Sequence, residues 1–398
     1  MKVQSGFWHS ARFFILLLLL LLVTFSSHPA IMMMSRAAGM KSGTILSRYI
    51  LVVFAFLFIL CLNVKSMLSP KLIRTLLLIL MIIIVFFLIT FAIWKSRSML
   101  LDITSIGMCL AAIMIGWQLN LGQREIKIMS VVYAVSILFV GLSQIFINIG
   151  GFIIRDQYIA DNKNSLGVMM AVGGIVFILM GISQNKTMKR MLYYALSILM
   201  LVCMLTIRAR AAYLAFFLVV IFILRNYYRE YKLSNNFIIG AILLLALLIF
   251  LPQSVYDYVF NSFFQNQDTY GITSGRSVRN RAALRVLSQY PLRGNMFAKD
   301  DVGWVHNYPL NRAFEFGIVF CLPILIAYIY IMVQIVKRAL RASVMDYNNV
   351  GYFALLIPFI ISLAEPTFPF GPGTATVMCY ILFGISLKNS EIKSREGQ

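Results

Sequence analysis

Acidic residues are scarce in this sequence of 398 residues. Only 14 residues are Asp or Glu, against 35 Lys or Arg, and charged residues together make up 12% of the chain. Soluble proteins carry roughly 25% charged residues. A soluble chain in which 61% of the residues are hydrophobic would also expose more apolar surface than water tolerates. The composition therefore predicts an integral membrane protein.

Cysteine, histidine and the common catalytic motifs are also sparse. The five cysteines lie within or beside apolar runs and form no CxxC pair, which argues against a disulfide framework or a zinc site. Two of the three histidines flank the first apolar run, which leaves His306 as the one of interest. The sequence contains no P-loop, GxGxxG, HExxH or GxSxG motif, so it gives no support for nucleotide use or conventional hydrolase chemistry. We expect no cofactor and no metal.

The formal net charge of +21 does not indicate nucleic-acid binding. The basic residues occur in twos and threes at the ends of apolar runs instead of gathering on one polar face. This distribution is typical of cytoplasmic loops and of helix ends that reach lipid headgroups.

The long apolar runs predict an all-α fold with about twelve transmembrane helices, because about 20 mostly apolar residues cross a bilayer. We expect one polytopic membrane domain over residues 1–398, and we keep the first run as a span because Ser-Ser-His-Pro-Ala is a poor signal-peptide cleavage site. The predicted spans are Phe13–Met34, Ile45–Asn63, Leu72–Trp94, Met99–Trp117, Ile126–Asn148, Leu166–Ile182, Met191–Ile207, Ala211–Leu224, Phe237–Leu251, Phe316–Val336, Gly351–Leu363 and Thr374–Leu387.

One connection between these spans is long and hydrophilic, from Pro252 to Glu315. Placing it outside puts both chain termini and 19 basic residues on the inner side, against nine basic residues in the remaining outer connections. Because inner loops are enriched in Lys and Arg, this charge distribution supports a large outer loop and cytoplasmic termini.

Two arginines are exceptions to that charge distribution. Arg208 and Arg210 lie between two apolar runs with almost no loop, and therefore at the outer membrane boundary. A mid-membrane Arg is unfavourable by roughly 2.5–3.5 kcal/mol, so an Arg near this depth often has a function. Ordinary snorkelling at a helix end explains the position equally well.

The outer loop contains a basic stretch with helical periodicity, over residues 273–288. We expect Val278, Ala282 and Val286 to share an apolar stripe, with Arg281 on another face. Ser274 is the expected N-cap, and Pro291 follows the expected end of the helix. A helix N-terminus beside Arg276 suits a diphosphate, although a basic helix resting on anionic headgroups is an equal alternative.

His306 lies in the same loop, about ten residues before the next span. An imidazole, with an ordinary pKa of about 6.5, can accept a proton from a hydroxyl near neutral pH. Trp304, Tyr308, Tyr290 and Tyr270 are candidate platforms for sugar rings. A lone loop histidine is more often structural, however. Glu365, in a Pro-rich outer connection, is either a partner of the arginine cluster or an ordinary interfacial carboxylate.

These elements together resemble the bacterial O-antigen polymerase and O-antigen ligase superfamily. The resemblance rests on Asn162-Lys-Asn-Ser-Leu-Gly167, Thr206-Ile-Arg-Ala-Arg-Ala-Ala212, Ser274-Gly-Arg-Ser277, the run from Arg281 to Gly294, and His306-Asn307 before Gly317. It covers roughly the C-terminal two thirds of the chain. The family pattern after His-Asn is met except at its end, where this chain has Phe320.

The resemblance implies a metal-independent, inverting glycosyltransferase that uses undecaprenyl-diphosphate-linked glycan at the periplasmic face of the inner membrane. It implies that Arg210, Arg276 and His306 are catalytic. We also expect a set of neighbouring residues to bind substrate: Arg208, Arg279, Arg281, Trp304, Asn307, Tyr308 and Glu365. His306 would orient or deprotonate the acceptor hydroxyl, or only hold the acceptor. A chain-length regulator and a flippase of the same pathway are implied partners, with membrane lipid and without nucleic acid.

We expect a polymerase, which extends a glycan on its lipid carrier, partly because of Phe320. The alternative is a ligase, which transfers the finished glycan to lipid A–core. A flippase or other transporter is a less favoured alternative, because transporters tend to have internal repeats and polar residues near the bilayer midplane. A purely structural membrane protein is the fourth alternative.

Overall fold

The computed structural model describes residues 2–39, 44–94, 99–147, 163–207, 209–231, 276–295, 305–371 and 373–396, which form helices and no strands. The longer helices are α1 (Lys2–Phe25), α3 (Thr44–Leu60), α5 (Lys71–Trp94), α6 (Met99–Gln118), α7 (Gln123–Ile147), α9 (Lys163–Ile182), α10 (Thr187–Thr206), α11 (Arg210–Tyr231), α15 (Arg276–Gln289), α17 (Tyr308–Arg341), α18 (Val350–Ile361) and α19 (Gly373–Glu396). Three short elements connect them: α2 (Pro29–Ala37), α4 (Val64–Met67) and η1 (Tyr347–Asn349).

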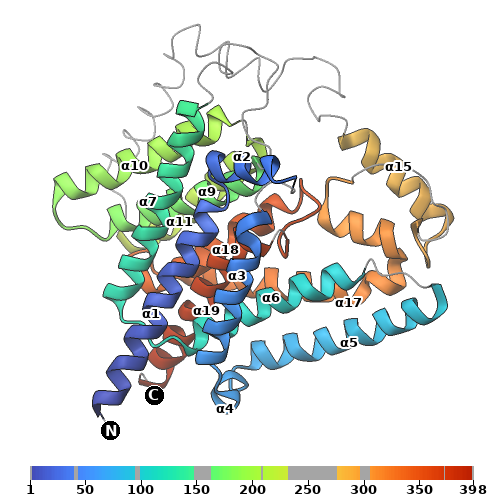
Figure 1. Ribbon diagram of the computed structural model, residues 1–398, viewed down its shortest axis with the longest axis horizontal. Coiled ribbons are helices and arrows are strands. Elements are labelled where there is room, and N and C mark those ends of the chain that lie inside the picture. Colours follow the sequence, from blue (N-terminus) through green and yellow to red (C-terminus); the bar gives the residue numbers. More distant parts are fainter. Residues whose placement is uncertain are drawn as a thin grey trace, which may run out of the picture.

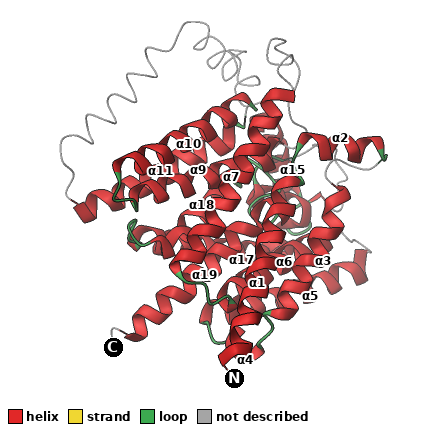
Figure 2. Ribbon diagram, turned by 60° about the vertical axis from the view of Figure 1, so that its left-hand side comes forward, coloured by secondary structure: helices red, strands yellow, loops and turns green. Residues whose placement is uncertain are grey.

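The helices form one bundle with two distinguishable ends. The start of α1, the short helix α4 and the end of α19 lie at one end, at the bottom of Figure 1, whereas α2 and α15 lie towards the other (Figure 1). The same separation is visible after the 60° turn (Figure 2). The polar helix α15 therefore lies away from the end at which the chain begins and finishes.

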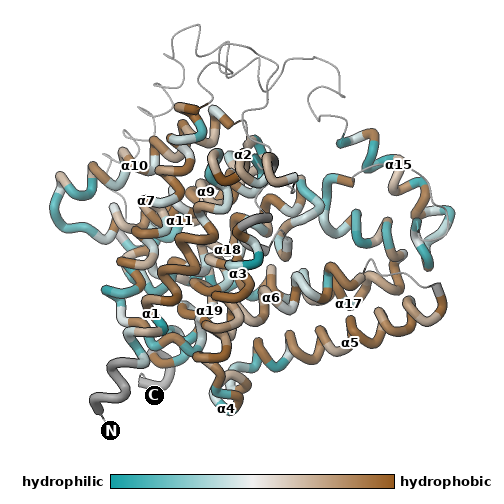
Figure 3. The backbone as a smooth tube through the Cα atoms, in the orientation of Figure 1, coloured by the Kyte–Doolittle hydropathy of each residue, from teal (hydrophilic) through white to brown (hydrophobic). Residues whose placement is uncertain are grey.

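Eight of the described helices are long and apolar enough to cross a membrane. Apolar residues run along α1, α3 and α5, whereas α15 is largely polar (Figure 3). Large hydrophobic side chains are exposed on the outer helices, including Leu78, Met81 and Leu88 on α5. An apolar outer surface of this kind is tolerated by lipid and not by water. The fold is that of an all-helical membrane protein.

The centre of the bundle is formed by α9, with α7, α10, α11 and α18 around it, and α6 packs against α19 beside them. The helix α9 is apolar from Leu166 to its end and almost entirely buried. Small residues let α6 and α19 approach closely: a Cβ atom added to Gly116 would lie 2.1 Å from the Ile381 carbonyl oxygen, and one added to Gly384 would lie 2.2 Å from the Ile113 carbonyl oxygen. Such small-residue contacts are the usual basis of tight helix packing in membranes.

Several predicted spans differ from the observed helices. The predicted span Phe13–Met34 is wrong as one helix, because α1 ends at Phe25 and Pro29, which cannot continue its hydrogen bonding, begins α2. The helices α3 and α18 are shorter than a full crossing. The predicted span Phe237–Leu251 lies outside the described residues. The helix α17 begins at Tyr308, within the predicted long connection, and is broken at Gly317, next to the predicted start of a span at Phe316.

Candidate functional site

The helix predicted in the long connection is present as α15, and it ends at Gln289, two residues before Pro291. Its buried side agrees with the predicted stripe at Val286 but not at Val278. Val278 is exposed, whereas Ala283 and Val286 are buried against Val305 and Phe314. Arg276 and Arg279 precede Ala283 at helical spacing and are therefore directed to the same side. The stripe that faces the rest of the protein thus begins with two arginines.

A turn after α15 fixes this helix against α17. Both Gly294 and Gly317 have positive φ, at 56° and 73°, and the break at Gly317 divides α17 into a short first part and a long second part. The Ile318 backbone N–H donates to the Pro291 carbonyl at 2.7 Å across the break. Only glycine adopts such conformations readily, so these two residues set how α15 lies against the first part of α17.

The first part of α17 is attached to the end of α18. Asn307 is the N-cap: its side-chain oxygen accepts from the Leu310 N–H at 2.9 Å, and its Nδ2 donates to the Leu363 carbonyl at 3.1 Å. The Tyr308 N–H donates to the Ser362 carbonyl at 2.8 Å. N-capping satisfies a backbone donor that a helix start leaves free. Asn307 therefore positions the preceding His306, and both ends of its amide are engaged within the chain.

Glu365 lies at the centre of the charged cluster that this arrangement creates. It is buried, with 4% of its surface exposed, and it follows the end of α18. Its Oε1 accepts from Arg276 Nη2 at 2.6 Å, and its Oε2 lies 3.6 Å from His306 Nδ1. A buried carboxylate is costly unless it is paired, and the pair with Arg276 meets that requirement. Of the two interpretations of Glu365, the one in which it pairs with the arginine cluster is therefore confirmed, through Arg276.

His306 lies between Glu365 and a second arginine. Arg279 Nη1 is 3.2 Å from His306 Nε2, on the opposite side of the ring from Glu365. A guanidinium only donates, so His306 Nε2 is the acceptor in this contact, while Nδ1 faces the Glu365 carboxylate at 3.6 Å without a hydrogen bond. The histidine side chain is one-fifth exposed, and so remains accessible.

A second buried cluster supports the first part of α17 from the side of α6. Arg312 Nε lies 3.1 Å from the Asp102 carboxylate, and its guanidinium also contacts Glu315. The Arg312 guanidinium lies 5.2 Å from the centre of the Tyr308 ring. Asp102 was not among the residues predicted from the sequence. It is the only acidic residue in α6, and an acidic residue within a span is the signal that would have identified it.

The structure also corrects the role expected for Tyr308. This side chain is 1% exposed, and its ring stacks on Tyr328 at 5.7 Å and meets the edge of Phe370 at 5.6 Å. With Arg312 over its remaining surface, the ring has no free face for a sugar. Tyr308 is a packing residue, so the prediction that it binds substrate is wrong.

The structure brings together only part of the predicted site. Arg276, Arg279, His306, Asn307 and Glu365 are in contact directly or through one another. Arg281 is exposed on another side of α15. Arg210 is the first residue of α11, beside Ala209, which packs closely on Gly167 of α9. Arg208, Trp304 and Tyr270 lie outside the described residues.

Comparisons with known proteins do not add to this geometry. No model of a known protein family matches the chain. No curated protein matches it significantly. Among the residues that the structure describes, no group of three or more His, Cys, Asp or Glu side chains is placed to hold a metal ion.

Proposed function

We propose that this chain is a polysaccharide polymerase that transfers a glycan from a lipid diphosphate to a sugar hydroxyl at the outer face of the inner membrane. The observation that supports this function best is the contact network of Arg276, Glu365, His306 and Arg279. It combines an oriented imidazole with two guanidinium groups. It also lies at the ends of apolar helices, where a lipid carrier would present its diphosphate.

Arg276 and Arg279 are suited to bind the lipid diphosphate, which is the leaving group of the proposed reaction. Guanidinium groups bind phosphate oxygens through paired N–H groups and keep their charge at all relevant pH values. Arg276 and Arg279 project from the same side of α15 and remain partly exposed. They can therefore stabilise the charge that develops on the diphosphate as the bond to the sugar breaks.

The His306 imidazole is suited to accept the proton of the acceptor hydroxyl. In the proposed reaction the acceptor oxygen attacks the anomeric carbon, the bond from that carbon to the diphosphate oxygen breaks, and the hydroxyl proton passes to His306 Nε2. Arg279 occupies the position next to Nε2 in this structure. It would turn from the imidazole to the diphosphate when the donor binds, which leaves Nε2 free for the hydroxyl.

Deletion and complementation in the source bacterium test this function on a lipopolysaccharide gel. A polymerase predicts that the deletion strain keeps single repeats attached to lipid A–core but loses long chains. Loss of all attached glycan would instead indicate the ligase. An unchanged profile, or full complementation by each of His306→Ala, Arg276→Ala and Arg210→Ala at normal membrane levels, would refute the enzymatic proposal.

A further inference from the structure

A cavity of about 550 Å³ lies at the opposite end of α17 from His306. It is lined by the last turns of α17, the segment around η1 and the C-terminal part of α19. The part of α17 after Gly317 ends at Arg341, and at about 1.5 Å per residue it is about 36 Å long. This length exceeds the roughly 30 Å hydrocarbon core of a bilayer. The cavity is therefore at the other membrane surface.

The lining of the cavity is basic and rich in hydrogen-bond donors. Lys337, Arg338 and Arg341 contribute positive charge, and Asn348, Asn349 and Asn389 contribute amides. The acidic lining residue is Asp346, whose carboxylate also accepts from the Asn348 N–H at 3.1 Å. Three cations against one carboxylate leave an excess of positive charge in a space large enough for a phospholipid headgroup.

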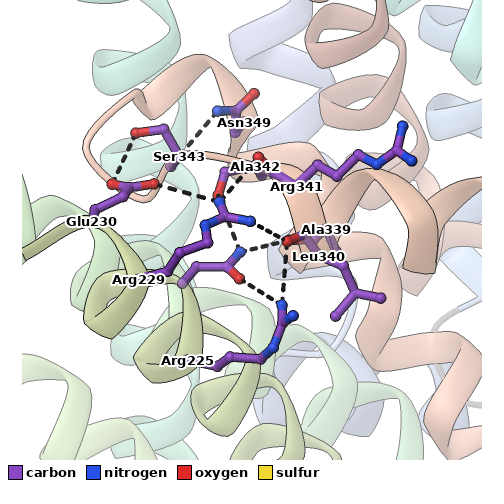
Figure 4. Close-up of polar contacts among 10 residues, drawn as sticks. Arg225, Arg229, Glu230, Ala339, Leu340, Arg341, Ala342, Ser343 and Asn349 are labelled. Atoms are coloured by element: carbon purple, nitrogen blue, oxygen red, sulfur yellow. Dashed lines mark hydrogen bonds and ion pairs between the residues drawn. The ribbon is translucent and has the colours of Figure 1, made fainter. Parts of the chain in front are cut away.

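These basic residues are not needed to neutralise the end of α17. The last carbonyl groups of a helix carry partial negative charge and attract cations, but here they are satisfied by α11. Asn226 Nδ2 donates to the Ala339 carbonyl at 2.6 Å, and Arg229 Nη1 donates to the Leu340 carbonyl at 2.8 Å. Arg225 Nη1 also reaches Leu340, at 3.3 Å. In Figure 4 the Arg341 side chain extends away from Arg225 and Arg229.

We propose that this cavity binds the phosphate group of an anionic phospholipid headgroup. Arginine, lysine and amide donors are the groups that recognise phosphate, and basic pockets between membrane helices on the inner side are suited to such lipids. The site is independent of the proposed transferase reaction, since it lies across the membrane from His306. It would attach the ends of α17 and α19 to the inner leaflet.

Thermal unfolding of the full chain in neutral detergent tests the proposal. Short-chain phosphatidylglycerol is titrated, with phosphatidylcholine and inorganic phosphate as separate arms at equal ionic strength. Binding to the folded state raises the unfolding midpoint with ligand concentration. We expect phosphatidylglycerol alone to raise it, and Lys337→Ala/Arg341→Ala to weaken the apparent affinity by about tenfold or more. Both substituted side chains are exposed, so the variant should fold.

The matched control is Lys186→Ala/Lys189→Ala, which removes two exposed charges at the start of α10. This control should retain the wild-type response to phosphatidylglycerol. Equal stabilisation by phosphatidylcholine, or an equal loss in both variants, would overturn the proposal. A full shift with inorganic phosphate would also overturn it, because the site would then bind free phosphate and not lipid.

Discussion

The backbones of Gly294 and Gly317 are in direct contact, although one follows α15 and the other divides α17. A Cβ atom added to Gly294 would lie 2.5 Å from the Gly317 backbone nitrogen, and one added to Gly317 would lie 2.4 Å from the Leu292 carbonyl oxygen. Neither residue can carry a side chain unless the backbone moves. Because α15 carries Arg276 and the first part of α17 follows His306, this contact determines the distance between the arginines and the imidazole.

Gly317→Ala and Gly294→Ala should therefore reduce both stability and activity. A left-handed conformation costs an ordinary residue roughly 1–2 kcal/mol, and the backbone clash adds roughly 1–3 kcal/mol. Gly39→Ala is the matched control, since Gly39 has a φ of 68° but nothing within 4 Å of the added Cβ atom. Thermal unfolding should rank Gly39→Ala as the mildest change, and an equal effect at all three positions would argue against the close contact.

Glu365→Gln should reduce transfer while the protein still accumulates in the membrane. The amide keeps the shape of the side chain but loses the charge that pairs with Arg276 and orients His306. We expect a loss of activity on the order of 10²-fold, comparable to removal of one stabilising group from an active site. Glu125→Gln is the control, because Glu125 also contacts a histidine, His9 at 2.7 Å, near the N-terminus. Equal activity in both variants would contradict the role of Glu365.

The pair of Asp102 and Arg312 should contribute to stability. Removing one member of a buried ion pair typically costs about 3–5 kcal/mol. Arg312→Met leaves Asp102 without its partner, whereas after Asp102→Leu the Arg312 guanidinium keeps its contact with Glu315, so the first loss should be the larger. Arg312→Met and Asp102→Leu should each lower the unfolding midpoint, and the double variant should recover much of the loss. A double variant with the sum of the two single losses would show that the two side chains are not coupled.

The transmembrane arrangement can be tested with single introduced cysteines. The five native cysteines are all buried, so they should give little background with a membrane-impermeant maleimide. Arg281→Cys, on the exposed side of α15, should be labelled in cells with a permeabilised outer membrane. Lys189→Cys, in the first turn of α10, should be labelled only after the inner membrane is opened. The reverse pattern would place His306 in the cytoplasm and exclude the proposed reaction.

The sequence predicted the helical membrane fold and the presence of α15 well, because apolar runs and helix-breaking prolines are local signals. The side of α15 that is buried could be predicted only in part this way. The pattern of Val278, Ala282 and Val286 suggested one face, but the contact between Gly294 and Gly317 turns Arg276 and Arg279 inward instead. That contact joins segments far apart in the chain, and hydrophobic periodicity does not report it.

Contacts between distant segments also explain why the roles of Tyr308 and Glu365 could not be predicted correctly from the sequence. Tyr308 was expected to bind sugar because it lies in a loop motif, but the early start of α17 places its ring between Tyr328, Phe370 and Arg312. The role of Glu365 could not be decided from the sequence, because nothing in its own segment indicates that Arg276 lies 2.6 Å away. Individual site residues could be predicted from the sequence. The residues that they contact could be identified only from the folded structure.

The most direct test of the proposed function is a reconstituted transfer reaction. The purified chain in liposomes is given undecaprenyl-diphosphate-linked repeat units, and both glycan length and released undecaprenyl diphosphate are measured. We expect one lipid diphosphate released for each bond formed, with a rate lowered by roughly 10²–10⁴-fold in His306→Ala and not in His28→Ala. Elongation at the wild-type rate in His306→Ala, or the absence of any transfer by the intact chain, would contradict the account.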